Sequence, residues 1–141
     1  MSVPVGEREE GKFTLAIKAE KLLRYTLDIT ANEGVFVPDY RKTVTDDIVA
    51  SAKNVYLFIR DANDTHVRMG TSFQPRDWAE RNAYQREALR YARRLLYLID
   101  IAHRIFHLSG KRVKYWGGMT IEVRNRIQGW MDADTQRYHH S

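Results

Sequence analysis

Apolar residues recur every three or four positions along most of this 141-residue chain. This spacing is typical of helices that bury one face, and no stretch shows the apolar–polar alternation of a half-buried strand. Only three prolines and eight glycines interrupt the pattern, which favours long helices. Because an amphipathic helix has to cover its apolar face, we expect helices packed against one another in a single all-α domain.

Four segments carry the helical periodicity: Lys12–Asn32, Thr43 or Thr45 to Asn63, Pro75–Leu108, and Tyr115–Asp132. Gly117 and Gly118 fall early in the last segment and move its expected start toward Met119 or Thr120. Short links between four amphipathic segments predict an up-down-up-down antiparallel four-helix bundle. The bundle is expected to span residues 12–132, with a flexible leader at 1–11 and a flexible tail at 133–141.

The link between the first two helices, residues 34–43, is rich in apolar and aromatic side chains. Pro38 restricts Val37 to an extended backbone. We therefore expect this link to be held against the bundle by Phe36 and Tyr40, while the next link, residues 64–74, is polar.

Charge is distributed unevenly along the chain. Residues 1–70 carry 10 basic and 11 acidic groups, a net of −1, whereas residues 71–141 carry 13 basic and 7 acidic groups, a net of +6. Eleven of those 13 basic residues are arginine, whose planar guanidinium binds phosphate through two parallel hydrogen bonds. The second half therefore indicates either a polyanionic partner such as nucleic acid or a protein that is simply basic.

A row of arginines gives the sharpest signal. Five fall opposite the apolar face of the third helix, the first four within about 60° on a helical wheel: Arg86, Arg90, Arg93, Arg104 and the adjacent Arg94. Few carboxylates interrupt the row, although Asp100 can pair with Arg104 at i+4. Guanidinium groups spread over ~27 Å of helix repel one another unless anions neutralise them.

We predict that these five arginines contact phosphate, with Lys111, Arg112 and Lys114 extending the surface. Arg124 and Arg126 are further candidates for the same surface. A solvated helix face without a ligand is the alternative.

Several classes of function lack support in the sequence. The chain has no cysteine, no apolar run near the ~18–20 residues that span a bilayer, and no phosphate-binding glycine loop or nucleophile elbow. His103 and His107 share a helix face but have no third ligand. We therefore expect a non-enzymatic, cytoplasmic protein that needs no metal or cofactor and does not enter a membrane.

Aromatic residues are more numerous than a small bundle needs for its core. Trp116 and Trp130 are expected to be core or interface anchors. With Tyr84, Tyr91 and Tyr97 they support a second hypothesis, an oligomeric protein-interaction scaffold that binds no nucleic acid.

Particular residues in three parts of the chain carry a family resemblance. These are Tyr25-Thr26-Leu27 with Ile29; Phe36, Pro38, Tyr40-Arg41, Thr43–Thr45 and Ala62-Asn63; and Lys114-Tyr115-Trp116, Gly129-Trp130, Asp132 and Arg137. Over roughly Lys18 to Arg137 the sequence resembles a small four-helix-bundle family. That family includes proteins of ribosomal-RNA intervening sequences and the accessory variability determinant of diversity-generating retroelements. Gly117-Gly118 departs from the family pattern.

The resemblance implies a ring-like homopentamer with a positively charged surface. In the retroelement branch, which we favour, it also implies association with a reverse transcriptase and template RNA. There the protein supports mutagenic cDNA synthesis without catalysing it. Relatives outside retroelements share the fold without an established activity. Preference for RNA, DNA or a hybrid, and the identity of the polymerase, stay open at this stage.

Overall fold

The protein is a four-helix bundle. The computed structural model describes residues 5–139, and the side chains of residues 14–139, and it contains no strand within that part of the chain. Its long helices are α1 (Val5–Thr30), α2 (Asp46–Asp64), α3 (Gln74–Ile105) and α4 (Gly110–Tyr138). The all-α prediction with four helices is therefore confirmed.

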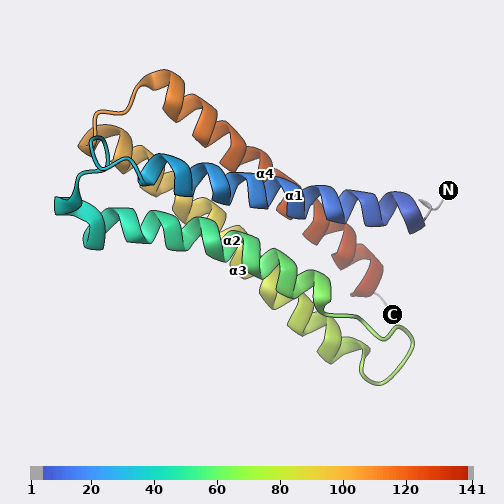
Figure 1. Cartoon of the computed structure of the whole chain (residues 1–141). Helices are drawn as coiled ribbons and strands as arrows, with labels where there is room; N and C mark the ends of the chain where they lie inside the picture. Colours follow the sequence, from blue (N-terminus) through green and yellow to red (C-terminus); the bar gives the residue numbers. More distant parts are fainter. Residues whose placement is uncertain (1–4, 140–141) are drawn as a thin grey trace.

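Consecutive helices run in opposite directions (Figure 1). The α1–α2 and α3–α4 connections lie at one end, which we call the two-loop end; the α2–α3 connection, the start of α1 and the end of α4 lie at the other. Both α1 and α3 pack against α2 and α4. One long side of α3 therefore faces outward, away from the other helices.

The core follows the predicted apolar faces. Trp116 is fully buried, and its indole N–H donates a hydrogen bond of 3.0 Å to the Thr26 hydroxyl. That hydroxyl donates in turn to the Leu22 carbonyl at 2.7 Å, so each polar atom of the pair has a partner, as burial demands. Burial of each surrounding aliphatic side chain stabilises the fold by about 1.5–3 kcal/mol. These side chains include Leu15, Leu22, Ile48, Val55, Ile59, Leu95, Ile99, Val123 and Ile127.

The α1–α2 connection is docked on the bundle as predicted. Phe36 is 1% exposed, with its ring centroid 4.6 Å from that of Phe106. The edge of Tyr40 meets the same Phe106 ring at 5.9 Å. A π-helical turn (Arg41–Thr45) runs directly into α2, and no side chain caps either the turn or the helix.

The start of α4 differs from the prediction. The helix begins at Gly110, ahead of Tyr115, because the Ser109 hydroxyl caps it by accepting a hydrogen bond from the Arg112 backbone N–H at 3.2 Å. The predicted end of the preceding helix at Leu108 is also wrong, since α3 stops at Ile105 and His107 adopts a left-handed φ of 54°. Gly117 and Gly118 lie inside α4, whose register is fixed by burial of Trp116.

Both ends of the bundle extend beyond the predicted limits of 12 and 132. The backbone is helical from Val5, consistent with the lack of proline between residues 5 and 37. At the other end α4 continues to Tyr138, because Asp134 and Tyr138 are buried. Helices therefore cover residues 5–11 and 133–138 of the expected leader and tail, whose flexibility stays a prediction, and residues 1–4, 140 and 141 lie outside the described chain.

Candidate nucleic-acid interface

The five predicted arginines of α3 lie together on its outward side. Each is exposed, and the residues of α3 that fill the core, among them Ala88, Ala92 and Leu95, are fully buried on the opposite side. Tyr97, with 72% of its surface exposed, lies among them. We call this surface the arginine face: Arg86, Arg90, Arg93, Arg94, Tyr97 and Arg104.

Two of these arginines have carboxylate partners on the same helix. Arg104 pairs with Asp100 at 3.0 Å, as the sequence predicts, and Arg90 lies 3.6 Å from Glu87, a pair that was not anticipated. The side chains of the first pair are 70% and 60% exposed, and those of the second 59% and 39%. Exposed pairs of this kind contribute about 0–1 kcal/mol, so a phosphate group can compete for either guanidinium.

Arg86, Arg93 and Arg94 have no carboxylate within ion-pair distance among the described residues. Arg94 instead lies with its guanidinium carbon 5.7 Å from the centre of the Tyr91 ring. Tyr91 stacks on Phe58 of α2, with ring centroids 5.8 Å apart and 10° between the planes. The arginine face therefore carries three charges that no described acidic residue neutralises, one of them held against an aromatic stack.

The other predicted basic residues, Lys111, Arg112 and Lys114, are exposed at the start of α4. No acidic residue occupies the first turn of this helix, so the basic side chains add to the positive end of the helix dipole. They lie at the start of α4 and Arg104 lies in the last turn of α3, so all four are at the two-loop end. Charge repulsion at this end would be relieved by bound anions.

A small groove of about 300 Å³ lies beside these residues. It is lined by Tyr25, Ser109, Lys111, Arg112 and Tyr115. Burial raises the pKa of the Tyr25 phenol, while the nearby positive charge of Arg112 acts in the opposite direction. Tyr25 and Tyr115 meet edge to face at 5.1 Å, so aromatic and basic side chains adjoin here as well.

Arg81, on the same helix as the arginine face, has a different environment. Only 4% of its side chain is exposed, and its Nε donates to Asp134 Oδ2 on α4 at 2.8 Å. Gln85 donates to the same oxygen at 2.7 Å. Arg81 Nη1 lies 3.2 Å from the carbonyl oxygens of Ala62 and Thr65, at the end of α2. This guanidinium therefore joins three helices and is not available to a ligand.

The α2–α3 connection contains a second organised ion pair. Arg68 donates to Asp77 from its backbone N–H at 3.0 Å and from two guanidinium nitrogens at 2.8 Å. These hydrogen bonds, with the charge of Arg68, lower the pKa of the Asp77 carboxyl from 3.8 to about 2. The connection turns at Gly70, whose φ of 72° favours glycine. No local sequence pattern predicts either of these arginine–aspartate pairs.

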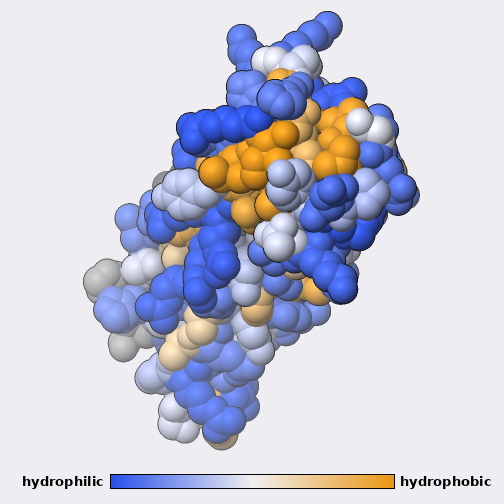
Figure 2. Space-filling model, turned by 90° about the vertical axis from the view of Figure 1, so that its left-hand side faces the viewer, coloured by the Kyte–Doolittle hydropathy of each residue, from blue (hydrophilic) through white to orange (hydrophobic). Residues whose placement is uncertain are grey.

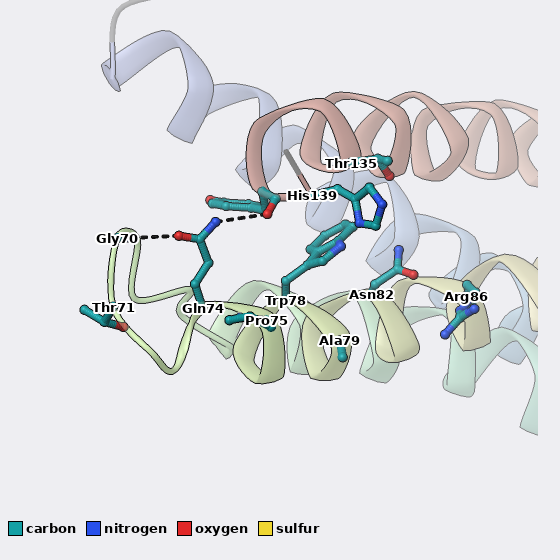
Figure 3. Close-up of a pocket in the computed structure, with 11 residues that line it drawn as sticks. Gly70, Thr71, Gln74, Pro75, Trp78, Ala79, Asn82, Arg86, Thr135 and His139 are labelled. Atoms are coloured by element: carbon teal, nitrogen blue, oxygen red, sulfur yellow. Dashed lines mark hydrogen bonds between the residues drawn. The ribbon is translucent and has the colours of Figure 1, made fainter. Parts of the chain in front are cut away.

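A larger groove, of about 760 Å³, opens between the first turns of α3 and the last turns of α4 (Figure 3). Figure 3 shows Trp78 and Asn82 reaching from α3 toward Thr135 on α4 and His139 directly after it, with Arg86 further along α3. Gln74 closes the other side by accepting from the Gly70 N–H at 2.7 Å and donating to the Tyr138 carbonyl at 3.0 Å. We call it the α3–α4 groove; no local sequence pattern predicts it.

Apolar side chains gather at the two-loop end (Figure 2). The α1–α2 connection contributes Val35, Val37 and Val44, which are half-buried, and α3 contributes Ile105 and the 40% exposed Ile101. Trp130, the other predicted anchor, packs partly buried against the core.

The described residues contain no group of three or more histidine or acidic side chains that could hold a metal ion. His103 is half-buried and His107 is exposed. None of the helices in residues 5–139 combines the length and apolar character that crossing a membrane requires.

Comparison of the chain with models of protein families, with curated proteins and with solved structures finds no match.

Proposed function

We propose that this protein is a non-enzymatic nucleic-acid-binding protein whose arginine face contacts the phosphate backbone. The observation that carries the proposal is the set of three exposed arginines, Arg86, Arg93 and Arg94, that no described carboxylate neutralises. Phosphate is the anion that suits them, because guanidinium binds it through two hydrogen bonds. Such contacts read charge and shape, and carry no base code.

The remaining basic residues extend this surface. Arg90 and Arg104 can exchange their exposed carboxylate partners for phosphate at little cost. Lys111, Arg112 and Lys114 add positive charge at the start of α4. Binding then releases counterions from the nucleic acid, so the affinity falls steeply with salt.

The cellular role that we propose follows from the family resemblance. The protein acts as the accessory subunit of a diversity-generating retroelement, associating in the cytoplasm with its reverse transcriptase and template RNA during mutagenic cDNA synthesis. A ring-like homopentamer is part of this proposal. The arginine face supports the accessory role, because an accessory subunit that catalyses no reaction has to hold the nucleic acid.

The test is a charge reversal of the three unpaired arginines. In Arg86→Glu/Arg93→Glu/Arg94→Glu we expect binding of labelled single-stranded RNA to be lost in fluorescence anisotropy, while circular dichroism stays helical. The matched control, Arg24→Glu/Lys53→Glu/Arg60→Glu, changes the net charge equally at exposed positions of α1 and α2 and should keep most of the affinity. Equal losses in both variants would show that net charge alone is responsible.

The apolar surface at the two-loop end favours a second candidate function, an oligomeric protein-interaction scaffold. A scaffold would oligomerise in light scattering yet retain no RNA at low or moderate salt. Retention of RNA that depends on the arginine face would contradict it.

A further inference from the structure

We propose that the α3–α4 groove binds an unpaired nucleobase of a single-stranded nucleic acid whose phosphates lie on the arginine face. This inference rests on the proposed function and makes it more specific, because it adds base stacking to contacts that otherwise involve only phosphates. Trp78, Asn82 and Arg86, spaced four residues apart on one flank of α3, carry it.

The groove has the size and walls that a base needs. Its volume of about 760 Å³ lies within the range of small-ligand sites, ~300–1,000 Å³. Aromatic side chains line it from both sides: Trp78 on α3, Tyr138 at the end of α4, and His139 directly after α4. Trp78 and Tyr138 pack on each other with centroids 5.7 Å apart, so the aromatic wall is held in place before a ligand arrives. Trp78 and Tyr138 are each only 8% exposed and form a fixed apolar wall, so the exposed ring of His139 is the flat π surface on which a base of any sequence stacks.

Asn82 supplies hydrogen-bonding groups inside the groove. Its side-chain N–H donates to Gln85 at 3.3 Å, which leaves one N–H and the carbonyl oxygen to face a ligand. An amide with a donor and an acceptor side by side matches the edge of adenine. Figure 3 shows this amide directed from α3 toward α4, across the groove.

Arg86 connects the groove to the arginine face. It lines the groove and is also one of the three arginines without a described carboxylate partner. Four residues of helix separate it from Asn82, about 6 Å along the axis, which suits a base beside Asn82 whose phosphate lies on Arg86. The next phosphates can then follow α3 toward Arg93.

The experiment compares two labelled RNA 12-mers by fluorescence anisotropy: oligoadenylate, and the same backbone with abasic sites. Both carry the same number of phosphates. Because stacking of a base contributes ~1–3 kcal/mol, we expect oligoadenylate to bind about 5-fold or more tightly than the abasic strand. Asn82→Ala should lower affinity for oligoadenylate at least about threefold and leave the abasic strand unaffected. Asn54→Ala, on α2 and outside the groove, is the matched control and should behave as wild type.

A second measurement addresses the base directly. Adenosine monophosphate should quench tryptophan fluorescence saturably in the wild type and more weakly in Asn82→Ala, whereas ribose 5-phosphate should not quench. Equal binding of both 12-mers, with no effect of Asn82→Ala, would overturn the base site and leave phosphate binding intact. Failure of both 12-mers to bind at low salt would overturn this inference together with the proposed function.

Discussion

Arg81 and Arg86 lie five residues apart on α3, yet their environments have almost nothing in common. Arg81 is buried with 4% of its side chain exposed, bonded to Asp134 and to the end of α2. Arg86 is exposed and has no described carboxylate partner. The same contrast separates two regions of the molecule, the packed end around the α2–α3 connection and the outward arginine face.

The arginine-rich helix α3 therefore contains two kinds of arginine, one buried and one exposed. Arg81 at the packed end holds helices together, because a buried guanidinium needs a charged partner and Asp134 of α4 provides it. The arginines on the outward face contribute little to folding, so their positive charge is available for binding. The two kinds can be separated experimentally, since one should affect stability and the other affinity.

The largest effect is expected from Arg81→Ala. Removing one partner of a buried pair leaves Asp134 uncompensated and should lower the free energy of unfolding by about 3–5 kcal/mol. Urea denaturation followed by circular dichroism measures this loss. Arg86→Ala should change the free energy by less than about 0.5 kcal/mol. Similar values for the two variants would remove the distinction between the regions.

A second test uses pH at the packed end. Asp77 has a folded pKa of about 2, below its ordinary 3.8, because Arg68 stabilises the carboxylate. The stability that this pair contributes is fully present above pH ~4 and is lost as the pH falls toward ~2. We expect Asp77→Asn to be less stable than wild type at pH 6 and to lose less stability between pH 4 and 2. Parallel profiles of the two proteins in acid would contradict this role.

The smallest effect concerns the exposed pair on the arginine face. Glu87→Gln removes the partner of Arg90 and should change stability by less than about 0.5 kcal/mol. RNA affinity should rise by less than about fivefold, the equivalent of 1 kcal/mol, because Arg90 becomes free for phosphate. Glu20→Gln, an exposed acidic residue of α1, controls for the charge change. Weaker RNA binding in Glu87→Gln would mean that the pair itself is needed.

Periodicity was sufficient to predict the helices and their buried faces, because burial of one side of a helix leaves a 3.6-residue pattern. The prediction failed at the start of α4, because the low helix propensity of Gly117 and Gly118 argued against a helix there. The Ser109 cap and the burial of Trp116 stabilise this part of α4. Periodicity also gave no sign of the Arg81–Asp134 bond, because those residues are 53 positions apart.

The arginine face could be predicted from the sequence, whereas the α3–α4 groove could not. The wheel placed the arginines on one exposed face and anticipated the Asp100–Arg104 pair. Trp78, Asn82 and Arg86 form a visible i, i+4, i+8 stripe, but the groove needs a second wall. That wall comes from Thr135 at the end of α4 and from His139 directly after it, in a segment predicted to be a flexible tail, so no local pattern could reveal it.

The central claim is that Arg86, Arg93 and Arg94 neutralise phosphates, and salt dependence tests it most directly. The measurement is the slope of log Kd against log salt for single-stranded RNA, in wild type and in Arg86→Ala/Arg93→Ala/Arg94→Ala. Three lost contacts at about 0.7 each predict a slope smaller by about 2 in the variant. An unchanged slope would mean that phosphates bind elsewhere on the protein and would contradict the account.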